Sequence, residues 1–113
     1  MITKEVFIME KISLLDYQEF DEKRFTKKNI FTKTESVAFM LKFFPGQEMP
    51  AHKHPGMNLS ILAIQGNGVF TLDDQEVPLI KNEILQCSGE QRIAFKNTST
   101  EKVSLYVVMN NQV

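Results

Sequence analysis

Two histidines lie two positions apart in the segment GQEMPAHKHPGMN, which covers residues 46–58. They are His52 and His54, and the chain has no other histidine. On a β-strand, residues i and i+2 point to the same face, with Cα atoms roughly 6.5–7 Å apart. Two imidazoles so placed can bind one metal ion at about 2.0–2.2 Å each. The spacing alone leaves two interpretations open, a pair of metal ligands or two polar residues at a solvated strand end.

The segments that must position this pair have a dominant period of two. Residues 36–44, SVAFMLKFF, are apolar on both faces, which is typical of a strand covered on both sides, as in a sandwich or an oligomer interface. Turn signals recur about every eight to twelve residues from about residue 45 onward, a rhythm typical of an all-β sandwich or barrel. Further strands are expected over residues 59–64, 68–72, 77–80, 83–87, 92–95 and 103–109.

Connectors and the N-terminal region complete the expected architecture. The turn-rich residues 73–76, DDQE, predict a hairpin. The polar segment KNTSTEK, residues 96–102, has the composition of a second hairpin connector, with Asn97 as a turn residue. A short helix is a candidate over residues 14–23, where leucines and aromatic residues could form one apolar stripe. Residues 5–9, EVFIM, are a candidate strand that pairs with a partner subunit.

Length and composition limit the class of protein. A chain of 113 residues is one domain with one modest core. The net charge of −1 gives no general attraction to nucleic acid, and the short basic cluster within residues 23–28 is interpreted as a solvated face. The sequence has no run of about eighteen apolar residues and no secretory signal, so we expect a cytoplasmic protein without a membrane span. The single Cys87 excludes an internal disulfide and suits a reducing compartment.

The histidine segment resembles a known sequence motif. Gly46, His52 and His54, followed by PGMN, resemble the first motif of the cupin superfamily. Residues 82–97, NEILQCSGEQRIAFKN, resemble the second cupin motif in length and apolar rhythm. The resemblance implies an all-β fold, the double-stranded β-helix or jelly-roll barrel of the cupins.

The resemblance extends from residue 36 to about residue 109 and implies a division of the chain. Residues 36–113 are expected to form the cupin barrel. Residues 1–35 are expected to form an N-terminal extension, a strand and a short helix that pack on the barrel or on a partner.

The resemblance also implies which residues hold a metal in this family. His52 and His54 occupy the positions of the paired histidines, whereas Asn58 replaces a glutamate and Ile93 replaces the third histidine. An amide is a poorer ligand than a carboxylate for a divalent cation, and isoleucine is not a ligand. A divalent ion at the histidine pair therefore stays open, with nickel, zinc, iron or manganese as candidates.

Two acidic residues could complete such a metal site. Glu48 has the strand parity of His52 and His54, and it could supply a carboxylate if it faces inward. Glu90 could reach the ion if its loop folds over the barrel mouth.

Three functions follow from these observations. The first, which we favour, is a cupin barrel that binds a small molecule between His52, His54, Asn58 and Ile93, because binding tolerates an incomplete set of metal ligands. The second is a metal-dependent enzyme, such as a dioxygenase or an isomerase, which the intact histidine pair favours. The third is a structural or regulatory dimer without catalysis. The two apolar faces of residues 36–44 separately predict a homodimer.

Overall fold

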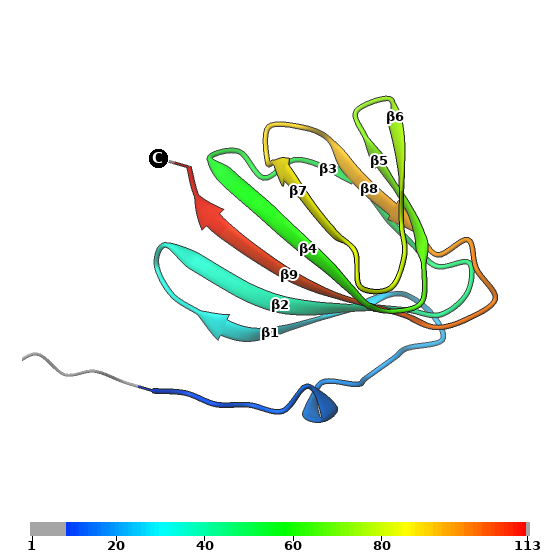
Figure 1. Ribbon diagram of the computed structural model, residues 1–113, viewed down its shortest axis with the longest axis horizontal. Helices are drawn as coiled ribbons and strands as arrows, with labels where there is room; N and C mark the ends of the chain where they lie inside the picture. The colour runs from blue at the N-terminus through cyan, green and yellow to red at the C-terminus, as the bar shows by residue number, and fades with distance from the viewer. Residues whose placement is uncertain (1–8, 113) are drawn as a thin grey trace, which may run out of the picture.

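The computed structural model describes residues 9–112 of the chain. These residues form nine strands and one short 3₁₀ helix, as Figure 1 shows. In chain order the elements are η1 (Leu14–Asp16), β1 (Thr26–Thr32), β2 (Ser36–Phe43), β3 (Glu48–His52), β4 (Met57–Gln65), β5 (Gly68–Leu72), β6 (Gln75–Leu79), β7 (Ile84–Ser88), β8 (Ile93–Lys96) and β9 (Val103–Asn111). No helix within residues 9–112 is long and apolar enough to cross a membrane.

The strands form two antiparallel sheets. One sheet has the order β1-β2-β9-β4-β7 and the other has the order β3-β8-β5-β6. The buried core takes apolar side chains from both sheets, so the sheets enclose one core between them. This arrangement confirms the all-β, double-stranded β-helix expected from the sequence. Each strand expected between residue 36 and residue 109 is present, with bounds that differ by a few residues.

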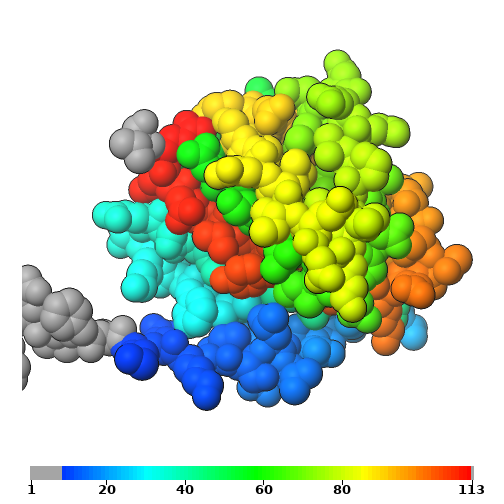
Figure 2. Space-filling model, viewed as in Figure 1, coloured from blue at the N-terminus to red at the C-terminus, as the bar shows by residue number. Residues whose placement is uncertain are grey.

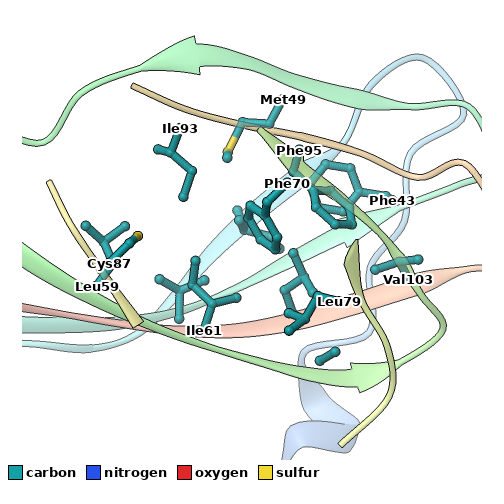
Figure 3. Close-up of a cluster of buried hydrophobic side chains, with 14 of the residues drawn as sticks. Phe43, Met49, Leu59, Ile61, Phe70, Leu79, Cys87, Ile93, Phe95 and Val103 are labelled. Carbon is teal, nitrogen blue, oxygen red and sulfur yellow. The ribbon is translucent and has the colours of Figure 1, made fainter. Parts of the chain in front are cut away.

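Three phenylalanines fill one end of the core. The ring of Phe95 lies 4.8 Å from that of Phe43 and 4.6 Å from that of Phe70, measured between centroids. Tilted aromatic pairs at such distances stabilise a core by about 0.5–1.5 kcal/mol each beyond the burial of their area. Figure 3 shows this cluster, and it shows Met49 and Ile93 reaching across the core from the side opposite Leu59 and Ile61.

The two expected hairpins have different outcomes. β5 and β6 pair through the turn at Asp73 and Asp74, so the first hairpin is confirmed. The prediction of a second hairpin is wrong, because β8 pairs with β3 and β5, whereas β9 pairs with β2 and β4. Residues 97–102 therefore connect the two sheets.

Asn97 organises this connector, as the sequence predicted for a turn residue. Its side chain is fully buried, and its Nδ2 donates to the carbonyl oxygens of Glu101 at 2.7 Å and Phe43 at 3.3 Å. Its Oδ1 accepts from the backbone N–H of Ser99 at 3.0 Å. One buried amide thus satisfies backbone groups of the connector and of the end of β2.

The N-terminal region differs most from the expectation. The helix expected over residues 14–23 is reduced to the single turn η1, capped by Ser13. The chain that follows packs on the barrel through Phe20, whose ring lies 5.2 Å from that of Phe44. The candidate strand at residues 5–9 falls outside the described residues except for Met9, which is exposed.

The strand β1, TKKNIFT, contains Lys27 and Lys28 of the basic cluster that was expected on a solvated face. This strand is the edge of the larger sheet and pairs with β2. On the outer face of β2, Lys42 lies under the ring of Phe20, with Nζ 5.5 Å from the ring centroid. Figure 2 shows the N-terminal segment in blue along the side of the barrel. The chain's own N-terminal segment therefore covers part of the outer face that motivated the homodimer.

Candidate ligand site between two edge strands

The barrel has a cavity of about 290 Å³. Its lining includes residues of β1 and β3, which are edge strands of the two sheets. Its polar lining residues are Lys27, His52 and His54. Within residues 9–112, no acidic side chain lines it. The rest of the lining is apolar and consists of Phe25, Phe39, Leu41, Met49, Pro50, Ala51, Leu59, Ile61, Phe70, Ile93 and Val107.

An irregularity in β3 turns His52 toward the cavity. Met49 pairs with Phe95 and His52 pairs with Ile93, so β3 has one more residue than β8 between these two pairs. Such a bulge shifts the alternation of the strand, which places both Met49 and His52 at the cavity although they are three positions apart. Pro50 lies within the bulge, where the loss of pairing tolerates a residue without an N–H.

The same bulge overturns the expectation for Glu48. That expectation assumed an unbroken alternation from Glu48 to the histidines. Glu48 instead pairs with Lys96, is exposed and does not line the cavity. Its carboxylate is therefore on the outer side of the sheet.

A backbone contact fixes the tautomer of His52. Its Nδ1 lies 2.7 Å from the carbonyl oxygen of Pro50. A carbonyl oxygen can only accept, so Nδ1 carries the proton and donates it. The lone pair of the neutral imidazole is therefore on Nε2, which is left free for a ligand, a proton or an ion.

His54 follows the end of β3 and is held by a turn. The carbonyl oxygen of His54 accepts from the N–H of Met57 at 3.1 Å, and the two central residues are Pro55 and Gly56, with a φ of 82° at Gly56. These are the features of a type II turn. The N–H of His54 donates to the carbonyl oxygen of Gly89 at 2.8 Å.

Gly89 makes this contact possible because it has no side chain. A Cβ at this position would overlap the carbonyl oxygen of His54 and would lie 2.7 Å from that of Met57. Gly89 was not among the residues expected at the site. Its neighbour Glu90 accepts from the N–H of Gly56 at 2.9 Å, so the carboxylate that was a candidate metal ligand stabilises the turn instead.

The two imidazoles lie together at the cavity. Their ring centroids are 4.6 Å apart and the rings are nearly perpendicular, at 82°. Burial, followed by the neighbouring His52 and Lys27, lowers the pKa of His54 from its ordinary value of 6.5. Near neutral pH the His54 imidazole is therefore mainly uncharged.

Lys27 is the polar lining residue that was not expected at the site. It pairs with Leu41, and because cross-strand partners share a face, its side chain lies on the inner side of the sheet. Its Nζ is 4.4 Å from the centroid of the Phe39 ring, within the range of a cation–π contact. The signal in the sequence was Phe25, an apolar residue of the same strand parity two positions earlier.

Of the other two expected site residues, Ile93 and Asn58, only Ile93 lies at the cavity. Ile93 lines the cavity and pairs with His52. Asn58 does not line the cavity, because it is exposed and alternates with the buried Leu59 on β4. Its Oδ1 lies 3.4 Å from the Nε2 of Gln112, away from the histidines.

Comparison with known proteins identifies the family of this barrel. Residues 39–109 match the family model described as Cupin domain. The chain is a cupin. No curated protein matches it in sequence.

Solved structures show the same barrel at low sequence identity. The cupin is similar to TT1209 from Thermus thermophilus, with a TM-score of 0.85 and 20% identity, over 93% of this chain and 100% of that one. An RmlC-like cupin from Desulfovibrio desulfuricans has a TM-score of 0.81 and 23% identity, over 91% and 97% of the two chains. A conserved protein with a double-stranded β-helix domain from Klebsiella pneumoniae has a TM-score of 0.85 and 18% identity, over 92% and 91%.

The metal that the cupin resemblance implies does not fit the residues present. Catalytic zinc sites have three protein ligands. In the described part of the chain, no group of three His, Cys, Asp or Glu residues could hold an ion. His52 and His54 are two neutral ligands, and the nearby ammonium of Lys27 repels a dication. The site therefore has too few ligands, and too positive an electrostatic environment, for tight binding of a divalent ion.

Proposed function

We propose that this cupin binds a small organic molecule in the cavity between β1 and β3, with His52 and His54 at the polar side of the site. The observation that carries the proposal is the cavity itself. Its volume of about 290 Å³ is near the lower end of ligand pockets, which range over roughly 300–1,000 Å³. An apolar lining with a few convergent polar groups is typical of such pockets.

The energetics of packing support a ligand. The cavity is open to solvent, so its apolar lining contacts water when no ligand is bound. Side chains such as Leu59, Ile61 and Phe70 contribute to this lining. A bound apolar molecule would remove this surface from water, and burial contributes about 25 cal/mol for each Å² of apolar area.

Although the donor set is too small for tight binding of a divalent ion, one feature keeps the metal-dependent enzyme as a second candidate. The Nε2 of His52 is free, and the His54 ring lies 4.6 Å away between centroids. Metal analysis of untagged protein purified without chelators tests this candidate. Near one ion per chain, lost in His52→Ala/His54→Ala, would favour it, and no ion would leave ligand binding as the function.

The expected surroundings are also part of the proposal. We place the protein in the cytoplasm because its single cysteine, Cys87, is a buried free thiol. We keep the homodimer as the assembly, although the outer face of β2 is partly covered within one chain.

Methyl NMR tests the ligand proposal directly. The protein is titrated with 1-hexanol, hexylamine and hexanoate, and the methyl resonances of Leu59, Ile93 and Val107 report on the cavity. We expect at least one probe to shift these resonances, and Val107→Phe to abolish the shifts by filling the space. Val108→Phe is the control, because Val108 is the next residue on β9 and does not line the cavity. No shift with any probe, or shifts that survive Val107→Phe, would contradict the proposal.

A further inference from the structure

We propose that the ligand of this cavity is a small carboxylate with an apolar body, whose charged group lies at Lys27 and His54 and whose body lies among the side chains of β2, β4 and β9. This inference rests on the proposed function, because it names the ligand class of the same site.

The charge of the cavity favours an anion. Lys27 lines the cavity, and the described residues place no carboxylate within ion-pair distance of it. Its neighbour Lys28 is different, because its Nζ lies 3.3 Å from the carboxylate of Glu19. Lys27 is thus a cation beside an apolar space, in contact with the ring of Phe39 and not with an acid. Lys27 is exposed, and a ligand carboxylate at the cavity could form an ion pair with its ammonium.

The hydrogen-bonding groups distinguish the roles of the two histidines. His52 donates its Nδ1 proton to Pro50, so its Nε2 offers an acceptor. His54 has an N–H on one ring nitrogen in either neutral tautomer. The donors available to a carboxylate are therefore the ammonium of Lys27 and the imidazole N–H of His54.

The apolar lining favours a ligand that has an apolar body as well as a charged group. Acetate would contact the polar residues and leave the rest of the cavity empty. Each methylene that enters an apolar site increases affinity by about fourfold, until the space is filled. A short acyl chain or one aromatic ring fits within a cavity of about 290 Å³. The chemistry that fits is a short aliphatic or aromatic carboxylic acid.

The test compares molecules that differ in one property. Binding constants are measured by calorimetry for hexanoate, 1-hexanol, hexylamine and acetate, on full-length protein treated with a chelator so that no ion bridges the carboxylate. We expect hexanoate to bind most tightly. Lys27→Met should weaken hexanoate by about fivefold and leave 1-hexanol unchanged. Lys53→Met is the matched control, because Lys53 is an exposed lysine between the two histidines that does not line the cavity.

A second measurement needs no variant. Added salt screens a charged contact at an exposed lysine, so it should weaken hexanoate more than 1-hexanol in the wild-type protein. If 1-hexanol or hexylamine binds as tightly as hexanoate, or if Lys53→Met weakens hexanoate as much as Lys27→Met, the anion inference is overturned and the ligand site stands. If none of the four molecules binds the wild-type protein, the proposed function fails with it.

Discussion

Gly89→Ala should displace His54 and destabilise the protein by about 2–4 kcal/mol. The new Cβ would overlap the carbonyl oxygen of His54, so the loop must move away from the turn. That movement breaks two backbone bonds, from the N–H of His54 to Gly89 and from the N–H of Gly89 to Met57. Each bond contributes about 0.5–1.5 kcal/mol, and overpacking costs about 1–3 kcal/mol. The two costs are not fully additive, because the displacement that breaks the hydrogen bonds also relieves part of the overpacking.

Gly46→Ala is the matched control for this effect. Gly46 has a φ of 83°, and a Cβ there would meet nothing within 4 Å. Its substitution should therefore cost about 1 kcal/mol, the penalty of a left-handed conformation for alanine.

Urea unfolding measures the two free energies, and the imidazole NMR signals of His54 report its position. Gly89→Ala should shift these signals and weaken any ligand at the cavity, whereas Gly46→Ala should do neither. Equal costs for the two variants, or an unmoved His54, would refute this account of how the turn is held.

Three further predictions concern the metal, a buried lysine and the assembly. Ile93→His should add a third imidazole opposite His52 and tighten zinc binding by about tenfold or more, measured by competition with a chromophoric chelator; an unchanged affinity would show that the position does not converge on the pair. Burial lowers the pKa of Lys42 from its ordinary value of 10.5, so the unfolded chain holds more protons between the folded-state pKa and 10.5. The stability of the wild type should therefore rise with pH in this window relative to Lys42→Met, which has no such group, and urea unfolding at a series of pH values up to 10 checks the sign; a constant difference would contradict it. Sedimentation at micromolar concentration should give a species of twice the chain's mass, and a single species of 13.0 kDa would exclude the homodimer.

The sequence predicted the strands well because their signal is local. Alternation of apolar and polar residues marks β4 and β5, and both faces of β2 are apolar, as the burial of these strands confirms. The histidine pair was also found from its spacing, although His54 lies beyond the end of β3.

The errors come from features that depend on distant partners. The bulge before His52 exists because of the pairing of β3 with β8, and no local pattern predicts the extra residue that turns Glu48 outward. Asn58 was placed by the motif, but its direction follows from the alternation that buries Leu59. β1 was missed because a basic edge strand has the composition of a solvated loop, and only its pairing with β2 shows that Lys27 lies on the inner side.

The strand that carries Lys27 has a consequence for how selectivity is encoded. The match to the family model begins at residue 39, so Phe25 and Lys27 precede the matched residues, although β1 is part of the larger sheet. The matched residues supply the histidines and most of the apolar lining, and β1 supplies the positive charge at the cavity. Under the carboxylate proposal, substitutions in β1 alone would therefore alter the charge preference of the site and leave most of its apolar lining unchanged. The residue that would set this charge preference and most of the residues that line the cavity thus belong to separate parts of the sequence.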